Sequence, residues 1–204
     1  MAPREGCLGR PQVLLYWAKN MSIWNWVIRQ AKKEYSPQAR IAAIAFEVAI
    51  FLVIIPSLLV YHSRLENGRV SISERPAFLV IGGLIAMCGI SLALWTMWVQ
   101  FHKAHGTPVP IMATKKLLTN KPYSLCRNPM ALGTILFYTG ISVIARSYLS
   151  VGTTIVITLF LIVMIKAFEE KEMALRFGED YMRYKKETPF LIPRVHWLRK
   201  KDGK

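Results

Sequence analysis

The feature that most constrains this chain is an apolar run of 23 residues, Ala77 to Val99, which contains no charged side chain. At 1.5 Å rise per residue, a helix of this length spans a hydrocarbon core of about 30 Å. A soluble protein with several buried core helices is the alternative, but a charge-free run of this length favours a membrane span. The run therefore predicts an integral membrane protein.

Two further apolar blocks extend this pattern. Ile41 to Tyr61 carries one charge, Glu47, in 21 residues. Ala131 to Phe168 is interrupted by the segment Arg146 to Gly152, so we interpret it as two shorter spans joined by a tight turn. The chain is 53% hydrophobic and only 19% charged, which departs from soluble domains in the same direction. These blocks predict an all-α, polytopic membrane helix bundle of about four spans.

Positive charge is distributed unevenly along the chain. Of the 27 Lys and Arg residues, 23 lie in segments 1–40, 100–130 and 166–204, and four lie in segments 62–76 and 146–150. Four spans place the first group on one side of the membrane, and the positive-inside rule makes that side the cytoplasm. We therefore expect a multi-pass protein with both termini in the cytoplasm. The net charge of +15 reflects this topology and contact with membrane lipids, and no nucleic-acid partner is expected.

Composition divides the chain into three parts. Residues 1–40 include the segment 12–34, whose mixture of Trp, Lys and Arg predicts an amphipathic helix at the membrane interface. Residues 41–99 form a predicted transmembrane hairpin. Residues 100–204 hold a proline-rich cytoplasmic loop, a second transmembrane hairpin and a C-terminal cytoplasmic helical cap.

Two adjacent carboxylates, Glu169 and Glu170, directly follow the last apolar block. They either begin a solvated, charged helix or belong to a site. Arg127 immediately precedes the third span, and in a bundle of hairpins this position lies at the same depth as the end of the fourth span. We therefore expect Arg127 and the glutamates to face one cytoplasmic-side cavity, because polar groups at this depth are costly unless they pair or line a wet site.

Other polar residues give weaker indications. Glu47 is an intramembrane carboxylate and so a functional candidate, although its position near the end of the span favours a side chain that reaches the interface. His102 and His105 have a spacing that suits a metal ion, but no nearby Cys, Asp or Glu completes a ligand set, so no metal is expected. The helix after the glutamates either continues through Gly178 or breaks there.

Two motifs carry a family resemblance. The segment KKLLTNKPYSLCRNPMALG, from Lys115 to Gly133, is followed about 35 residues later by EEKEMALRFGEDYMRYKKETPFLIPR, from Glu169 to Arg194. Together they resemble the isoprenylcysteine carboxyl methyltransferase and phospholipid methyltransferase family over about the last 90 residues. The resemblance implies a membrane enzyme that moves a methyl group from S-adenosylmethionine to a lipid or lipidated, isoprenylcysteine-like acceptor, with the cofactor site facing the cytoplasm.

The resemblance also implies roles for individual residues. Arg127 and Glu170 are the predicted catalytic residues, and Lys166 is the predicted acceptor-binding residue. The predicted cofactor-binding residues are Lys115, Lys116, Leu117, Leu118, Tyr123, Asn128, Pro129, Met130, Ala131 and Glu169.

The chain departs from the family pattern at three positions. It has Lys121 where the family has glycine, Ala131 where the family has tyrosine, and Ile165 where the isoprenylcysteine enzymes place an arginine that meets the acceptor carboxylate. Lys166, beside Ile165, offers a point charge in place of that arginine's forked donors. The pattern therefore supports methyl transfer more strongly than it supports an isoprenylcysteine acceptor.

Two other functions remain open at this point. An NADPH-dependent reductase of sterol-reductase-like architecture resembles the chain at Tyr181, Tyr184 and Pro193, but Glu169 and Glu170 would repel a phosphate-bearing cofactor. A non-enzymatic lipid-binding membrane protein is the other alternative, which the departures at Ala131 and Ile165 leave open.

Overall fold

All regular elements in the described part of the chain are helices, which confirms the predicted fold class. The computed structural model describes residues 36–67, 76–104 and 116–193. The helix expected at 12–34, together with His105 and Lys115, lies outside these residues. The elements are α3 (Pro37–Val48), the π-helical η1 (Ala49–Ile54), α4 (Ile55–Asn67), α5 (Pro76–Ala104), α6 (Pro129–Ala145), α7 (Tyr148–Met164), the π-helical η3 (Ile165–Glu169) and α8 (Glu170–Glu187).

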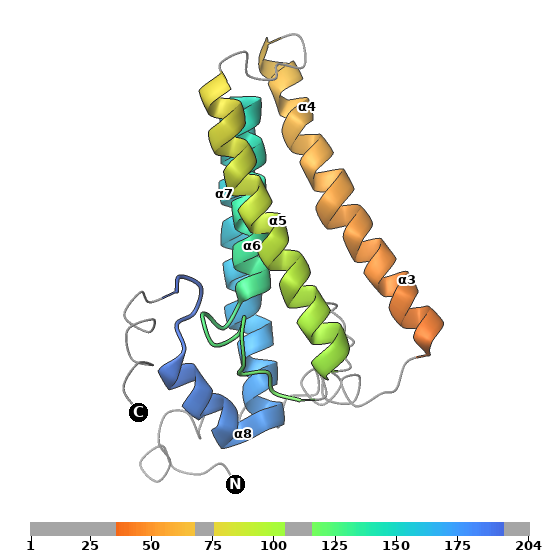
Figure 1. Ribbon diagram of the computed structural model, residues 1–204, viewed down its shortest axis with the longest axis vertical. Coiled ribbons are helices and arrows are strands. Elements are labelled where there is room, and N and C mark those ends of the chain that lie inside the picture. The colour runs from red at the N-terminus through yellow and green to blue at the C-terminus, as the bar shows by residue number, and fades with distance from the viewer. Residues whose placement is uncertain (1–35, 68–75, 105–115, 194–204) are drawn as a thin grey trace, which may run out of the picture.

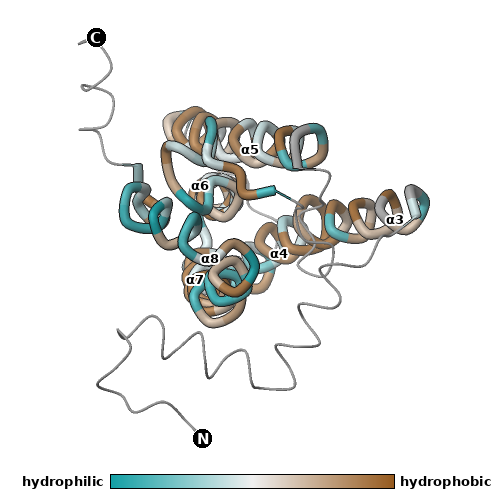
Figure 2. The backbone as a smooth tube through the Cα atoms, turned by 90° about the horizontal axis from the view of Figure 1, so that it is seen from below, coloured by the Kyte–Doolittle hydropathy of each residue, from teal (hydrophilic) through white to brown (hydrophobic). Residues whose placement is uncertain are grey.

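The helices are those of an integral membrane protein. Three continuous stretches are long and apolar enough to cross a bilayer, namely Ile41–Glu66, Pro76–His102 and Tyr148–Glu187, and a shorter apolar helix covers Pro129–Ala145. In Figure 1, α4, α5, α6 and α7 run alongside one another, whereas α3 diverges from α5 toward the lower end. Figure 2 shows that hydrophilic residues dominate α8, which lies at that lower end.

The predicted tight turn between the last two apolar helices is present and is shorter than the segment Arg146–Gly152. Arg146 ends α6 in a left-handed conformation, with φ of 47°, and Ser147 caps α7, which begins at Tyr148. Glu66 at the end of α4 also caps α7, because its carboxylate oxygens accept hydrogen bonds from the backbone N–H groups of Tyr148 (3.1 Å) and Leu149 (2.8 Å). These contacts fix the second hairpin against the first.

Glycines allow α5 and α6 to pack with their backbones in contact. They occur seven residues apart on each helix, at Gly82 and Gly89 of α5 and at Gly133 and Gly140 of α6. A Cβ atom at Gly89 would lie 2.4 Å from the backbone nitrogen of Phe137, so no larger residue fits without moving the partner helix. Small residues have the same use in other membrane helix pairs, where close approach replaces a hydrophobic driving force.

The helix after the glutamates breaks at Gly178, as one of the two sequence interpretations predicted. Gly178 has φ of 53° and ψ of −125°, a backbone conformation that side-chain-bearing residues rarely adopt. The break redirects the second half of α8 so that Tyr181 and Tyr184 are both buried. The Tyr184 hydroxyl donates a hydrogen bond to the carbonyl oxygen of Tyr123 (2.7 Å), which ties α8 to the loop before α6.

Gly178→Ala is expected to destabilise the protein by about 1 to 3 kcal/mol, because alanine is strained in this backbone conformation. No heavy atom lies within 4 Å of the position that the new Cβ would take, so the effect comes from strain and not from a clash. Thermal unfolding in detergent measures it. Gly152→Ala in α7 is the matched control, since Gly152 is helical and its Cβ also meets nothing. Equal unfolding temperatures for the two variants would contradict the prediction.

Candidate functional site

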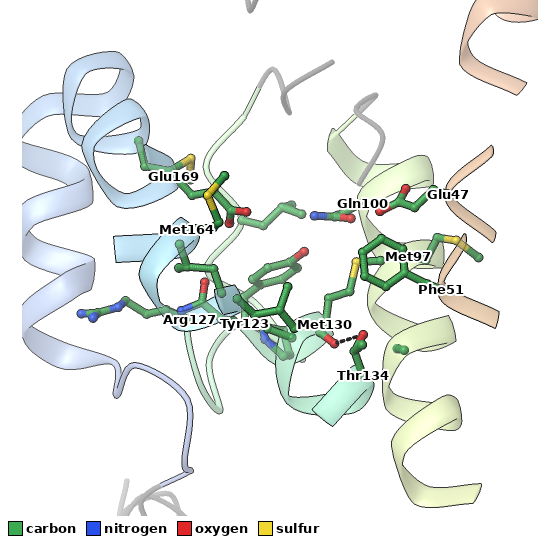
Figure 3. Close-up of a pocket in the computed structure, with 18 of the residues that line it drawn as sticks. Glu47, Phe51, Met97, Gln100, Tyr123, Arg127, Met130, Thr134, Met164 and Glu169 are labelled. Carbon is green, nitrogen blue, oxygen red and sulfur yellow. Dashed lines mark hydrogen bonds between the residues drawn. The ribbon is translucent and has the colours of Figure 1, made fainter. Parts of the chain in front are cut away.

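A cavity of about 400 Å³ lies where α6 begins and where α7 passes into η3 and α8. Its size falls within the range of small-molecule sites. Residues of α3 and η1 line one side of the cavity, and residues of α7, η3 and α8 line the other. Residues of α5 and of the start of α6 complete the wall (Figure 3). Most of the lining is apolar, and polar groups are confined to a few positions.

The structure brings most of the predicted site residues together around this cavity. The predicted residues that line it are Leu118, Tyr123, Arg127, Asn128, Pro129, Met130, Ala131, Glu169 and Glu170. The shared cavity for Arg127 and the two glutamates is therefore present as expected. Their roles in binding and catalysis stay predictions.

Three predicted residues are not part of the lining. Lys116 is exposed and Leu117 is half-buried in the loop before α6. Lys166 is exposed, and its Nζ atom lies 5.0 Å from the centre of the Phe190 ring, so its contact is with the C-terminal segment and not with the cavity. A role for Lys166 in acceptor binding stays a prediction that these contacts do not support.

Arg127 and Glu170 form an ion pair with nearly buried side chains, exposed by 11% and 10%. The Arg127 Nη2 atom lies 2.7 Å from Glu170 Oε1, and Lys185 Nζ lies 2.6 Å from the other carboxylate oxygen. Arg127 Nη1 also donates to the carbonyl oxygen of Lys185 (2.6 Å). These contacts give both residues a structural task, which is to hold α8 against the loop that precedes α6.

The segment after α8 is bound to the same loop through its main chain. The backbone N–H of Arg127 donates to the carbonyl oxygen of Pro189 (2.8 Å), and Asn128 Nδ2 donates to the carbonyl oxygen of Phe190 (2.9 Å). Asn128 also precedes α6 as its N-cap residue, with Pro129 at the first helical position. The segment Arg127 to Pro129 thus joins the start of α6 to the C-terminal segment.

Two of the carboxylates that line the cavity have no ion pair among the described residues. Glu172 is paired with Arg176 (3.1 Å) and Glu170 with Arg127, whereas Glu47 and Glu169 have no such partner there. The cavity therefore carries an excess of negative charge, and the two unpaired carboxylates lie close enough to repel each other. An organic cation would relieve this repulsion.

Three polar atoms at the cavity are buried without a hydrogen-bond partner in the described part of the chain. They are Gln100 Oε1, the Tyr123 hydroxyl and Arg127 Nε. Unsatisfied buried groups of this kind are rare in folded proteins and commonly mark a position where a ligand or water binds. Burial raises the pKa of the Tyr123 hydroxyl and of the nearby Cys126 thiol, so both groups are neutral at physiological pH.

Sequence reasoning did not assign several residues that line the cavity. Glu47 and Phe51 come from the first span, Met97 and Gln100 from the end of α5, and Met164 from the end of α7 (Figure 3). The sequence did mark Glu47 as a candidate functional residue, because it is the single charge in its apolar block. The structure places Glu47 in the cavity lining, and the expectation that its side chain reaches the interface stays a prediction. Phe51, Met97 and Met164 are ordinary apolar residues of the spans, and Gln100 is a single polar residue directly after a charge-free run, so none of them gave a clear sequence signal.

Both π-helical segments lie at the cavity. The segment η1 follows Glu47 by two residues and η3 ends at Glu169, and each contributes lining residues. The hydroxyl of Tyr138 in α6 donates to the carbonyl oxygen of Phe51 within η1 (3.0 Å). A π-helical turn rotates the residues on either side of it relative to an α-helix and is often found at functional sites.

Comparisons with known proteins give the family of the chain. The phospholipid methyltransferase family model matches residues 77–180, which extends from the start of α5 into α8. The cobalt-zinc-cadmium resistance protein CzcN of Cupriavidus metallidurans is 29% identical over 150 residues, which cover 72% of this chain and 61% of that protein. The chain thus spans less than two thirds of the length of this relative. No solved structure matches the chain. The family match covers half of the chain, and the protein belongs to the phospholipid methyltransferase family of membrane proteins.

Proposed function

We propose that this protein transfers a methyl group from S-adenosylmethionine to a lipid or lipidated acceptor within the membrane. The observation that carries the proposal is that the motif residues of the family match surround one largely apolar cavity at the end of the bundle. The first sequence motif supplies Tyr123 and Asn128 to this cavity, and the second supplies Glu169.

The residues at the cavity suit this cofactor. When bound, it supplies a methyl group attached to a positively charged sulfur, next to an ammonium group. Glu169 has no ion pair among the described residues and would offset this positive charge. The unsatisfied Arg127 Nε–H is available to a carboxylate. Tyr123, Met130 and the start of α6 would hold the adenosine part.

Methyl transfer by in-line displacement needs little from the protein beyond position and the exclusion of water. The ion pair between Arg127 and Glu170 fixes the two sequence motifs relative to each other. The mostly apolar walls of the cavity keep water out. An acceptor with an apolar chain would reach the cavity from the bilayer, past residues of the spans such as Phe51 and Phe160. By the distribution of Lys and Arg, the cavity end of the bundle faces the cytoplasm.

Cofactor binding tests the proposal through Glu169→Gln. We expect the purified protein to bind S-adenosylmethionine in calorimetry, and the variant to bind it about ten- to a hundredfold more weakly, because one charge-assisted contact is lost. Glu179→Gln, at an exposed position of α8 outside the cavity, is the control and should bind like the parent.

NADPH is titrated in parallel with the same three proteins. Binding of NADPH without binding of S-adenosylmethionine would move the assignment to a reductase. A folded protein that binds neither cofactor would refute an enzymatic function and leave a lipid-binding membrane protein.

A further inference from the structure

The two halves of the first membrane span are bound unequally to the rest of the bundle. The second half, α4, packs on α6 and α7. There the Ser150 hydroxyl donates to the carbonyl oxygen of Leu59, and His62 Nδ1 lies 3.2 Å from the Thr153 hydroxyl oxygen. The first half, α3, packs mainly on η1, which continues the same span, and it diverges from α5 in Figure 1. Phe46 in α3 is 69% exposed.

The two halves meet at η1, where a proline prevents one backbone hydrogen bond. The N–H of Ile55 donates to the carbonyl oxygen of Ile50, five residues earlier, as in a π-helix. The next pair in this pattern is Pro56 and Phe51, and proline has no N–H to donate. The Phe51 carbonyl oxygen instead accepts a hydrogen bond from the hydroxyl of Tyr138 in α6 (3.0 Å). The span is therefore fixed to α6 where its own hydrogen bonding is interrupted.

Interruptions of this kind are the places where helices bend. A proline and a π-helical turn each weaken the ladder of backbone hydrogen bonds, and both occur here between the firmly packed α4 and the sparsely packed α3. Lipid chains are as apolar as the side chains of a membrane helix, so no hydrophobic force holds α3 against α5 or away from it. Movement of α3 toward α5 exchanges contacts with lipid for contacts with a helix, and its energetic cost is low.

Movement of α3 would change the cavity, because this part of the span forms one of its walls. Glu47 and Val48 of α3 and Phe51 and Leu52 of η1 line the cavity, and in Figure 3 this wall stands opposite Glu169. Glu47 has no ion pair among the described residues, so a cation bound in the cavity attracts the wall that carries it. A ligand shifts such an equilibrium only through contacts that differ between the two states, and contact with α3 is one of them.

We propose that η1 is a hinge, fixed to α6 by the Tyr138 hydroxyl, about which α3 moves toward α5 when a ligand occupies the cavity. Tyr138 is a positioning residue in this device, since it contacts η1 and is not part of the cavity lining. The hinge follows from the structure of the first span, whereas the choice of S-adenosylmethionine as the ligand rests on the proposed function. Both α3 and η1 precede residues 77–180, so the moving part lies outside the family match.

Distances between pairs of spin labels test the hinge. The inner pair is attached to cysteines introduced by Ile41→Cys in α3 and Phe101→Cys in α5, at positions that are 64% and 46% exposed, after the three native cysteines are replaced by alanine. The outer pair, Leu65→Cys in α4 and Val80→Cys in α5, lies at the end of the bundle opposite the cavity. We expect S-adenosylmethionine to shorten and narrow the distance distribution of the inner pair and to leave that of the outer pair unchanged.

Two substitutions should change the hinge in opposite directions. Tyr138→Phe removes the bond that fixes η1, so we expect a broader inner distribution. Pro56→Ala supplies an N–H to the Phe51 carbonyl oxygen, so we expect a narrower inner distribution and a loss of the shortening by S-adenosylmethionine. In the Pro56→Ala protein Tyr138→Phe should have little further effect, because the carbonyl then has a partner within its own helix. Tyr148→Phe, at an 89% exposed tyrosine of α7, is the control and should behave like the parent.

The outcomes separate this inference from the proposed function. If Tyr138 has a structural role alone, Tyr138→Phe lowers the unfolding temperature but leaves the inner distribution of the folded protein unchanged, and the hinge is overturned. Equal changes in the inner and outer pairs would also overturn it, since they show a general loosening. So would binding of S-adenosylmethionine without a change in the inner pair. If S-adenosylmethionine does not bind but the two variants change the inner pair in opposite directions, the hinge is supported and the proposed function is refuted.

Discussion

Gly89→Ala is expected to lower the stability of the protein by about 3 kcal/mol or more, since one added methyl group must fit between two backbones. The new Cβ would lie 2.4 Å from the backbone nitrogen of Phe137 and 2.6 Å from the carbonyl oxygen of Gly133. Both are main-chain atoms of a helix, so neither can turn aside as a flexible side chain would. The two helices must separate.

Separation of α5 from α6 would also widen the cavity, because its walls come from both helices. Met97 and Gln100 lie toward one end of α5, and Met130 lies in the first turn of α6. We therefore expect Gly89→Ala to lose binding of S-adenosylmethionine as well as stability. Thermal unfolding and calorimetry in the same detergent measure the two effects.

Gly83→Ala is the matched control for this prediction. Gly83 is also in α5, but a Cβ there meets no heavy atom within 4 Å. Alanine is the better helix former, so this change should leave stability the same or slightly higher. If Gly83→Ala and Gly89→Ala unfold at the same temperature, the close packing of α5 on α6 is wrong.

Glu170→Met is expected to destabilise the protein by about 3 to 5 kcal/mol, because it leaves the guanidinium of Arg127 nearly buried with no carboxylate. The cost of Arg127→Met should be smaller, since Glu170 keeps its contact with Lys185. The double variant, in which both charges are replaced by apolar side chains of similar size, should be less destabilised than the sum of the single changes. Thermal unfolding of the four proteins gives the coupling between the two residues.

Lys185→Met shows which part of the network carries the effect. The Lys185 side chain is 38% exposed and can be hydrated, so its loss should cost much less than the loss of Glu170. If the losses of stability in Arg127→Met and Glu170→Met add up to the loss in the double variant, the two residues are not coupled. That result would contradict a stabilising ion pair between them. A catalytic role for these residues would appear instead as lost methyl transfer in a variant whose stability and cofactor affinity are unchanged.

The positions of the spans could be predicted because a helix surrounded by lipid needs a long run of apolar residues, and such runs are visible in the sequence. The charge-free run Ala77–Val99 lies within the span Pro76–His102, and the interruption at Arg146 marks the turn between α6 and α7. That Arg127 and the two glutamates line one cavity was expected from the topology, whereas the ion pair between Arg127 and Glu170 was not. Helices joined in hairpins bring these two span ends to one level.

The direction of individual side chains could not be predicted in the same way. The helices α5, α6 and α7 are apolar on all sides, so hydropathy does not show which face of α5 meets α6. The glycines that permit the contact are recognised only when both helices are placed. The π-helical turns have no sequence signal, and the place of Glu47 in the cavity lining is recognised only in the folded chain.

The bonds that hold the C-terminal segment also bear on how such proteins diverge. The acceptors at positions 185, 189 and 190 are main-chain carbonyl oxygens, and the donors are Arg127 and Asn128. Most amino acids at the three acceptor positions offer the same oxygen, so substitutions there can accumulate over evolution while the path of the chain is kept. Two relatives with unlike tails can therefore hold this segment against the loop before α6 in the same manner, provided that both retain the arginine and asparagine before α6.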